Sequence, residues 1–387
     1  MHGRRIAPGR ASGWPALLAL AAALILAARP AGAQASGAEG ASRPKGLLLT
    51  FLGDVMAHGV NFRASDYGAA YRPVRALLQR DSLTFANLET PVDPSRDCST
   101  FPQFNVGLDY LSAAVGAGIE VFSLANNHAC DQGAEGLAAT IGSLEAAGRR
   151  SYRRIWYAGT RAHPQVPFAP VEILLDGWRI GFLAATQQPN FPLPEPYVLH
   201  VDFWQEDQAG AFLELVREAA PRYDLFVVSY HGGREYARQP EPGRVRFFRR
   251  LLEAGADVVW GHHPHVLQDY ELVDRPEGRG LALYSTGNFL SGMTWDVDPL
   301  QPEVERAWTG DSALWAVWVQ PAPGRGEVTA VMPIPVTNVR GPRGTVVVST
   351  FPGLSAQGLS EPWTGYFRQR SLLLADSLRE WGLVDPH

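Results

Sequence analysis

The sequence has few cysteines and no excess of basic residues, and both shortages limit what the protein does. It contains 2 cysteines in 387 residues, which excludes a structural zinc site built from four thiolates. Its 34 lysine and arginine residues are outnumbered by 39 aspartate and glutamate residues, and the formal net charge is −5. A general nucleic-acid binder would present a basic face, so we expect no nucleic-acid partner. The sequence also shows no internal repeat and no coiled-coil pattern.

The first 34 residues have the pattern of a secretory signal peptide. Three arginines precede an apolar segment over residues 15–28, and Ala31-Gly32-Ala33 follows as a small-residue cleavage site. This apolar segment is shorter than the roughly 20 residues that a membrane-spanning helix needs. We therefore expect an exported protein, periplasmic or extracellular, in which residues 35–45 form a linker. The alternative is an uncleaved N-terminal segment that anchors the protein to the membrane.

Export changes how the two cysteines are interpreted, because disulfides form outside the reducing cytosol. Cys98 and Cys130 both follow segments that carry candidate site residues, so a disulfide between them would brace the rim of the site. The alternative is that Cys130 is a small buried residue with a free thiol. The sequence alone leaves both interpretations open.

Apolar runs alternate with amphipathic segments along residues 46–349, which predicts a layered α/β domain. The first run, residues 46–52, is almost continuously apolar, as in a strand covered on both faces. Expected strands cover residues 46–52, 83–86, 119–124, 171–175, 179–184, 225–229, 281–284, 315–319, 328–333 and 345–349, with one more before residue 261. Expected helices cover residues 71–80, 108–117, 134–147, 208–220, 242–254 and 363–381. Residues 350–387 would form a C-terminal extension whose helix packs on the domain.

Metal-ligand residue types follow the ends of these expected strands. The clearest case is Val258-Val259-Trp260-Gly261-His262-His263-Pro264-His265, where an apolar strand and a glycine lead into three histidines. Pro264 fixes one backbone angle between His263 and His265 and so limits the positions of their rings. Other strand ends carry Asp54, Glu89, Asn127 with His128, and His231. Asp54 taken alone would fit a helix cap or turn equally well.

Carboxylate, amide and imidazole donors in this number are enough to hold two divalent metal ions. Mixed oxygen and nitrogen ligands without thiolate suit Mn, Fe or Zn rather than Ca. Two such ions would generate hydroxide near neutral pH and stabilise both ends of an in-line displacement. His128 is a candidate to protonate a leaving oxygen. Asp131 fits either a helix cap or a carboxylate that supports the site.

Six segments in a fixed order carry these residues. They are Gly53-Asp54-Val55-Met56, Asn87-Leu88-Glu89-Thr90-Pro91, Ala125-Asn126-Asn127-His128-Ala129-Cys130-Asp131-Gln132-Gly133, His231-Gly232-Gly233-Arg234-Glu235-Tyr236, Gly261-His262-His263-Pro264-His265-Val266 and Ser285-Thr286-Gly287-Asn288-Phe289. Together they resemble the calcineurin-like metallophosphoesterases, and within them the CapA (capsule or poly-γ-glutamate synthesis protein) family, over roughly residues 46–295. The resemblance implies a four-layer α/β/β/α sandwich with the metals at one edge of the sheets.

The resemblance also implies roles for individual residues. Asp54 would bind the first metal and Glu89 would bridge both metals. Asn127, His231 and His263 would bind the second metal, and His265 would be a further ligand of the first. His128 occupies the position of a phosphate-contacting histidine in the superfamily.

The sequence departs from the superfamily in its first two motifs. The superfamily has Asp-x-His, whereas Met56 lies two residues after Asp54 and His58 is displaced by two. A bridging aspartate in Gly-Asp is replaced by Glu89 in Asn-Leu-Glu. A longer carboxylate and a missing histidine would weaken the first metal site or change its metal preference. His58 and His262 are the two candidates to compensate.

The first functional hypothesis is an exported metal-dependent hydrolase of a phosphoester or an anionic surface polymer, involved in capsule or poly-γ-glutamate biosynthesis. Arg234 would contact the substrate anion or remain a solvated surface residue, and Asn288 is a further site candidate. The alternative is a non-catalytic subunit that supports assembly or export of such a polymer, with polymer-synthase membrane subunits as partners. A purely structural histidine-rich protein would not explain why the candidate ligands follow successive strands.

Overall fold

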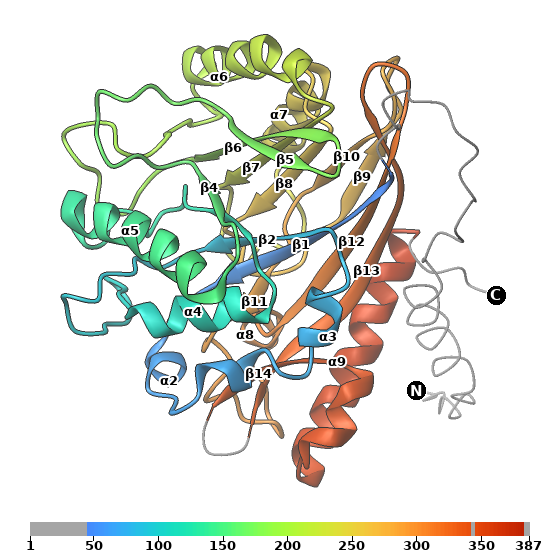
Figure 1. Ribbon diagram of the computed structural model, residues 1–387. Coiled ribbons are helices and arrows are strands. Elements are labelled where there is room, and N and C mark those ends of the chain that lie inside the picture. The colour runs from blue at the N-terminus through green and yellow to red at the C-terminus, as the bar shows by residue number, and fades with distance from the viewer. Residues whose placement is uncertain (1–44, 342–344, 383–387) are drawn as a thin grey trace, which may run out of the picture. The chain divides into compact units, whose positions relative to one another are not determined.

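The computed structural model describes residues 45–341 and 345–382, which form two β-sheets with helices beside them (Figure 1). The predicted signal peptide and all but the last residue of the predicted linker lie outside the described residues. Within the described ranges, no helix has both the length and the apolar character that a bilayer span requires.

The first sheet is centred on β1 and has the order β14-β13-β12-β1-β2-β3-β4. Its strands are β1 (Leu47–Val55), β2 (Leu83–Leu88), β3 (Val121–Ser123), β4 (Trp156–Ala158), β12 (Asp311–Pro321), β13 (Gly326–Arg340) and β14 (Val346–Thr350). The short strand β11 (Asn288–Leu290) also pairs with β1. Strands β1 to β4 run parallel, as do β1 and β11, so their carboxyl ends meet at one edge.

The second sheet has the order β5-β6-β7-β8-β10-β9. Its strands are β5 (Val171–Leu175), β6 (Trp178–Thr186), β7 (Leu225–His231), β8 (Val258–His262), β9 (Tyr270–Val273) and β10 (Gly280–Leu283). Strands β6, β7, β8 and β10 are parallel, and β5 and β9 are antiparallel edge strands. Asp176 and Gly177, both at positive φ, form the predicted tight hairpin between β5 and β6.

Within the described residues, five helices have ten or more residues and the others are short. The longer ones are α4 (Leu108–Ala117), α5 (Gly133–Ser151), α6 (Glu206–Ala219), α7 (Pro242–Glu253) and α9 (Glu361–Glu380). The short ones are α2 (Gly59–Phe62), α3 (Arg75–Leu78), α8 (Val304–Trp308) and the 3-10 helices η1 (Tyr67–Ala70), η2 (Ala220–Arg222) and η4 (Pro352–Gln357). In Figure 1, α6 and α7 lie beside the second sheet and α4 and α5 lie on the other side, beside the first.

Successive side chains of the second sheet point alternately into two cores. One core lies between the two sheets, and the other lies between the second sheet and its helices. Trp260 on β8 contacts Phe51 on β1 and Phe85 on β2, with ring centroids 5.5 and 6.1 Å apart, in the core between the sheets. Its neighbour Val259 belongs instead to the core that α6 and α7 cover, together with Phe247. A strand that is apolar on both faces requires a layer on each side. The predicted four-layer α/β/β/α sandwich is therefore confirmed.

The predicted helix over residues 71–80 is wrong for its first half. Only Arg75–Leu78 is helical, and turns precede it. Pro73 explains the difference, because proline lacks an N–H donor and disfavours the helical conformation of the residue before it. The three- and four-residue strands β4, β9 and β11 were not predicted, since so short a segment carries little periodic signal.

The C-terminal helix α9 packs against the rest of the described chain. Leu374 and Leu378 are buried in the main core. Arg370 forms a buried ion pair with Asp311 at the start of β12, with Nε 2.8 Å from Oδ2. Arg370 also lies over the ring of Trp308, with its guanidinium carbon 3.9 Å from the ring centroid. These contacts attach α9 to the first sheet.

Candidate metal centre

Parallel strands of both sheets end at one edge, and this edge gathers the predicted ligands. Asp54 near the end of β1 is in register with Asn87 of β2. His231 at the end of β7 is in register with His262 at the end of β8. All four side chains are buried, so four functional groups from distant parts of the sequence share one interior region.

Two hydrogen bonds hold the two sheets together close to this edge. The indole N–H of Trp260 donates to the main-chain carbonyl of Leu52 at 3.0 Å, and the hydroxyl of Thr286 donates to the same carbonyl at 3.1 Å. Leu52 lies two residues before Asp54, and Trp260 lies two residues before His262. These bonds therefore fix the spacing between the two halves of the site.

One set of four donor atoms consists of His231 Nε2 and three atoms near it. Asn127 Oδ1 lies 2.8 Å from this nitrogen, His263 Nδ1 lies 3.1 Å from it, and Glu89 Oε1 lies 3.7 Å from it. Ligands that bind one ion at about 2.1 Å lie about 3–4 Å from one another. The set has the spacing and the donor types of a site for a divalent transition metal.

A second set lies around Asp54 and His265. His265 Nδ1 is 3.2 Å from Asp54 Oδ2, and His265 Nε2 is 3.8 Å from Glu89 Oε1. Asp54, Glu89 and His265 each offer a ligand atom within 4.8 Å of the other two. On the other side of Asp54, His262 Nδ1 lies 3.2 Å from Oδ1. Glu89 belongs to both sets.

The Oε1 atom of Glu89 is the decisive atom of the site. It is fully buried and has no hydrogen-bond partner within residues 45–341 and 345–382, yet it lies 3.7 Å from His231 Nε2 and 3.8 Å from His265 Nε2. A buried carboxylate oxygen without a partner is costly unless a cation or a proton neutralises it. Among the described residues, the ion pairs of Glu89 and Asp54 are all with histidines. The residues present therefore fit divalent cations bound beside Glu89.

The local environment also sets the protonation state of these groups. Burial, and then repulsion by Asp54, raises the pKa of Glu89 well above its ordinary value. Burial, and then the nearby His263, lowers the pKa of His231 well below its ordinary value. Burial, and then His265, lowers the pKa of His263 to about 3. His231 and His263 are therefore neutral at physiological pH, which is the form that binds a metal.

Asp54 and His265 form a hydrogen-bonded pair whose pKa values move in opposite directions. Burial raises the pKa of Asp54, but the hydrogen bonds from His262 and His265 outweigh burial and leave the pKa well below its ordinary value. Burial lowers the pKa of His265, but the hydrogen bond and attraction to Asp54 outweigh it and raise the pKa. Asp54 is thus an anion in the folded protein, as a metal ligand must be.

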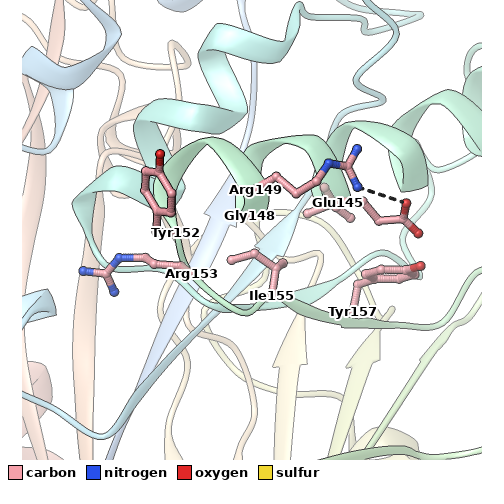
Figure 2. Close-up of a pocket in the computed structure, with 8 residues that line it drawn as sticks. Glu145, Gly148, Arg149, Tyr152, Arg153, Ile155 and Tyr157 are labelled. Atoms are coloured by element: carbon pink, nitrogen blue, oxygen red, sulfur yellow. Dashed lines mark ion pairs between the residues drawn. The ribbon is translucent and has the colours of Figure 1, made fainter.

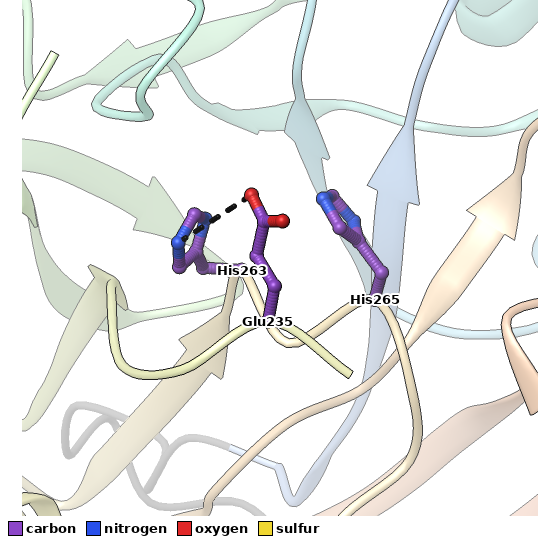
Figure 3. Close-up of side chains that lie close together, drawn as sticks. All are labelled: Glu235, His263 and His265. Atoms are coloured by element: carbon purple, nitrogen blue, oxygen red, sulfur yellow. Dashed lines mark ion pairs between the residues drawn. The ribbon is translucent and has the colours of Figure 1, made fainter. Parts of the chain in front are cut away.

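The backbone of the histidine loop is held in a costly conformation. His263 has φ +93° and His265 has φ +57°, in the left-handed region that residues with a Cβ adopt at a cost of about 1–3 kcal/mol each. Pro264 separates them. The result directs His263 toward His231 and His265 toward Asp54, and Figure 3 shows Glu235 standing between the two rings. Such strain persists only where the surrounding structure enforces it.

Comparison with known proteins now assigns the chain to a family. Residues 48–293 match the model of a family described as bacterial capsule synthesis protein PGA_cap. The chain belongs to this family. The matched range contains every predicted metal ligand of the edge described above, from Asp54 to His265.

Curated relatives of this capsule synthesis family member support the assignment. The capsule biosynthesis protein CapA of Bacillus anthracis is 28% identical over 64% of this chain and 61% of that protein. The PGA biosynthesis protein CapA of Bacillus subtilis (strain 168) is 24% identical over 64% of each chain. A probable polyglutamine synthesis accessory protein of Mycobacterium tuberculosis is 28% identical over 41% of this chain and 46% of that protein. The chain thus spans less than two thirds of the length of these relatives.

Solved structures give more distant matches. A hypothetical protein from Thermus thermophilus matches with a TM-score of 0.44 and 19% identity, over 75% of this chain and 98% of that chain. The calcineurin-like phosphoesterase YfkN from Bacillus subtilis matches with a TM-score of 0.39 and 12% identity, over 87% of this chain and 99% of that chain. The fold assignment of this family member therefore rests on the two sheets and the helices described above.

Asn87 is a central residue of the site that sequence reasoning missed. Its Nδ2 lies 2.8 Å from Asp54 Oδ1, 3.2 Å from His231 Nδ1 and 3.3 Å from Glu89 Oε2. One amide nitrogen therefore connects candidate ligands from three strand ends. The available signal was its spacing, because residues i and i+2 of a strand share a face, and Asn87 precedes Glu89 by two.

His128 forms a dyad with Asp131 beside the metal-ligand sets. Its Nδ1 lies 2.7 Å from Asp131 Oδ2, which also accepts a 2.7 Å hydrogen bond from the Phe104 N–H. The Phe104 ring meets His128 edge-on, with centroids 4.6 Å apart. The residue that caps α5 is Gln132. Of the two interpretations of Asp131, the structure therefore favours a carboxylate that orients His128 over a helix cap.

The remaining predicted residues lie at different distances from the centre. His262 lies against Asp54, whereas His58 accepts a hydrogen bond from the Gly292 N–H at Nδ1 and is not paired with Asp54. Asn288 Oδ1 lies 3.0 Å from His265 Nδ1 and so supports that ring. Arg234 is exposed. His58 instead borders a cavity of about 420 Å³ next to the site, together with Tyr236, Met293, Glu303, Arg306 and Thr309.

The disulfide that the sequence left open is not formed in this structure. Cys98 and Cys130 are both free thiols. Cys130 is buried and Cys98 is exposed, and burial, followed by the nearby Asp131, raises the pKa of Cys130 to about 11. Cys130 therefore matches the alternative of a small buried residue with an unreactive thiol.

A separate cavity of about 480 Å³ lies at the C-terminal end of α5 and contains none of the predicted site residues (Figure 2). Its charged side chains are already paired, Arg149 with Glu145 and Arg153 with Glu120. Leu144, Ile155 and Tyr157 supply apolar walls. This cavity has no donor set comparable to the strand-end site.

Proposed function

We propose that this protein is a metal-dependent hydrolase with two divalent ions, Mn, Fe or Zn, that acts on a phosphoester or an anionic polymer in capsule or poly-γ-glutamate biosynthesis. The observation that carries the proposal is Glu89 Oε1, a buried carboxylate oxygen without a hydrogen-bond partner between two donor sets. The family description and the names of the curated relatives support the biosynthetic context.

The chain's own residues would divide the work between binding and proton transfer. Asn127, His231 and His263 would hold one ion, Asp54 and His265 the other, and Glu89 both. When bound, such ions supply Lewis acidity and lower the pKa of water. In its doubly protonated form His128 would donate its Nδ1–H to Asp131 and would be able to transfer its Nε2 proton to the leaving oxygen. Asn87 would keep Asp54 and Glu89 apart and correctly oriented.

Metal analysis and hydrolysis assays test this proposal directly. Purified protein should contain about two Mn, Fe or Zn ions per chain and hydrolyse an aryl phosphomonoester, an aryl phosphodiester or a γ-glutamyl polymer. Asp54→Asn and His231→Ala should abolish both metal content and activity. His128→Ala should keep its metals and lose about 10²- to 10⁴-fold in kcat. Equal activity in wild type and His128→Ala would contradict the assigned role.

A second candidate is a non-catalytic subunit that supports assembly or export of an anionic surface polymer, with polymer-synthase membrane subunits as partners. The specific observation in its favour is the relative described as a probable polyglutamine synthesis accessory protein. A folded, metal-loaded protein that is inert on all three substrates but is cross-linked to membrane proteins in cells would support this candidate.

We further propose that the protein is exported, on the basis of the signal-peptide pattern that ends in the cleavage site Ala31-Gly32-Ala33. Cell fractionation should place it outside the cytoplasm, and N-terminal sequencing should find Gln34 as the first residue. A full-length chain in the membrane fraction would instead favour the uncleaved anchor.

A further inference from the structure

The loop that follows β7 is tied to the histidine loop and places a carboxylate beside it. The Tyr236 N–H donates to the Pro264 carbonyl at 2.9 Å. On either side, the Gly233 N–H donates to Gln187 Oε1 at 2.8 Å and the Ala237 carbonyl accepts from Gln268 at 2.6 Å. Tyr236 has φ +60°, a left-handed conformation that a tyrosine adopts only where its surroundings enforce it. Glu235, between these anchors, is therefore held next to residues 263–265.

The two ring nitrogens of His263 face different partners. Nδ1 lies 3.1 Å from His231 Nε2, on the side of the inner donor set with Asn127. Nε2 lies 4.0 Å from Glu235 Oε1, and Glu235 stands between the rings of His263 and His265 (Figure 3). The side chain of Glu235 is 44% exposed and that of His263 is 17% exposed, so the carboxylate is more accessible to solvent than the ring is.

We propose that Glu235 is a positioning residue for His263: its carboxylate accepts the Nε2–H and so leaves the Nδ1 lone pair to bind the ion in the set with His231 and Asn127. This inference rests on the two-ion site proposed above. A histidine that binds a metal through one nitrogen almost always donates its other N–H to a carboxylate, a carbonyl or water. The present 4.0 Å separation is longer than a hydrogen bond, so the half-exposed side chain would move inward by about 1 Å when the ion binds.

Direct ligation is the competing role, because Glu235, His263 and His265 each offer a ligand atom within 4.8 Å of the other two. The lone pairs of Nδ1 and Nε2 point away from each other across an imidazole ring. An ion on Nδ1 therefore lies on the side of His231, while the ion pair of Glu235 is with Nε2 of the same ring. As a positioning residue for His263, Glu235 should act mainly on the ion in the His231 set, because the His265 ring is held at Nδ1 by two other residues, Asp54 and Asn288.

Metal titration of the full chain tests the inference. Metal-free wild type, Glu235→Gln and Glu235→Ala are titrated with Co²⁺ alone, and binding is followed by the visible absorption of the bound ion and by calorimetry. Wild type should bind two ions. The variants should still bind two, but one of the two affinities should fall about 10- to 100-fold, and the absorption bands of that ion should shift. The other affinity should be unchanged.

Glu303→Gln is the matched control, because Glu303 is an exposed glutamate on the neighbouring cavity and is not a proposed ligand. It should titrate like wild type. Thermal unfolding of the metal-free variants should also match wild type, which separates an effect on the ion from a loss of folding. A merely structural role for Glu235 would lower the unfolding temperature and leave the spectrum of the bound ion unchanged.

Two results would overturn the inference. If both affinities in Glu235→Gln equal those of wild type, Glu235 does not act on His263. If one ion is lost even at saturating Co²⁺, Glu235 is a direct ligand and not a positioning residue. Wild-type protein that binds no ion would instead overturn the proposed function itself.

Discussion

The structure neutralises buried carboxylates in two different ways, and the contrast separates a structural ion pair from a candidate metal centre. Asp257 is fully buried between Arg275 and Arg325, with side-chain nitrogen–oxygen distances of 2.9 and 2.7 Å. Glu89 is equally buried, but its nearest ion-pair partners are histidine nitrogens at 3.7 Å or more. Arginine supplies a permanent charge, whereas a neutral imidazole supplies a lone pair. The first arrangement is complete within the chain, and the second would become complete with the cations proposed above.

The largest expected effect belongs to the arginine-paired carboxylate. Asp257→Ala leaves Arg275 and Arg325 without their shared partner in a buried region, which should lower the free energy of unfolding by about 3–5 kcal/mol. The loss should be the same with and without divalent metal, measured by denaturant unfolding. A loss below about 1 kcal/mol would mean that water reaches the arginines and that the contrast with Glu89 is overstated.

Acid should lower the stability of the metal-free protein through the buried histidine His58. Burial, followed by repulsion from His265 and His128, lowers the pKa of His58 to about 4. The unfolded chain then binds more protons between about pH 6.5 and 4, so stability is present above pH 6.5 and falls as pH falls through this window. The effect of this one group should be up to about 3 kcal/mol in metal-free protein. In His58→Asn, the stability measured between pH 7 and 4 should fall less steeply, and an unchanged slope would contradict the prediction.

Divalent metal should stabilise the folded protein through Asp54 and Glu89, the carboxylates that lie among histidines. It should not change the contribution of Asp257, which is paired with arginines. At 100 times its Kd, each bound ion should raise the free energy of unfolding by about 2.7 kcal/mol, and a chelator should reverse the gain. The gain should persist in Asp257→Ala if that variant folds, and disappear in Asp54→Asn. An equal gain in wild type and Asp54→Asn would place the binding elsewhere on the chain.

The smallest expected effect concerns metal-free Glu89→Gln. Wild-type Glu89 has an unpartnered oxygen and lies near the anionic Asp54, so replacing the acid by an amide removes a buried charge from a region that does not neutralise it. At pH 8 the metal-free variant should be as stable as wild type or more stable by about 1 kcal/mol. The gain on adding metal should be lost. A variant that is destabilised without metal would show that Glu89 contributes to the fold by itself.

Much of the strand-end site could be predicted because its residues are typical metal ligands and each follows an expected strand. Asp54, His231 and the histidine loop each follow an apolar strand, and the parallel order of those strands brings them to one edge. Asn87 was missed because an asparagine after an apolar run is also typical of a turn, and only its register with Asp54 makes it central. The choice between His58 and His262 likewise depended on side-chain direction.

Glu235 illustrates the same limit on the surface side of the site. Arg234 is the residue that the sequence offers as an anion contact. In the structure it is Glu235, next to Tyr236 in its left-handed conformation, that lies near His263. Backbone conformation of this kind cannot be deduced from residue type. Pro73, by contrast, was a local signal present in the sequence, and it accounts for the shortened helix at Arg75–Leu78.

The indole of Trp260 bonds to the Leu52 carbonyl across the interface of the two sheets, only two residues from a candidate ligand on each side. A slight sliding of one sheet over the other would therefore pull the two groups of candidate ligands out of alignment before either sheet loses its internal pairing. On gradual heating, release of the proposed metal ions should precede the loss of secondary structure, so the metal would leave a protein that is still largely folded.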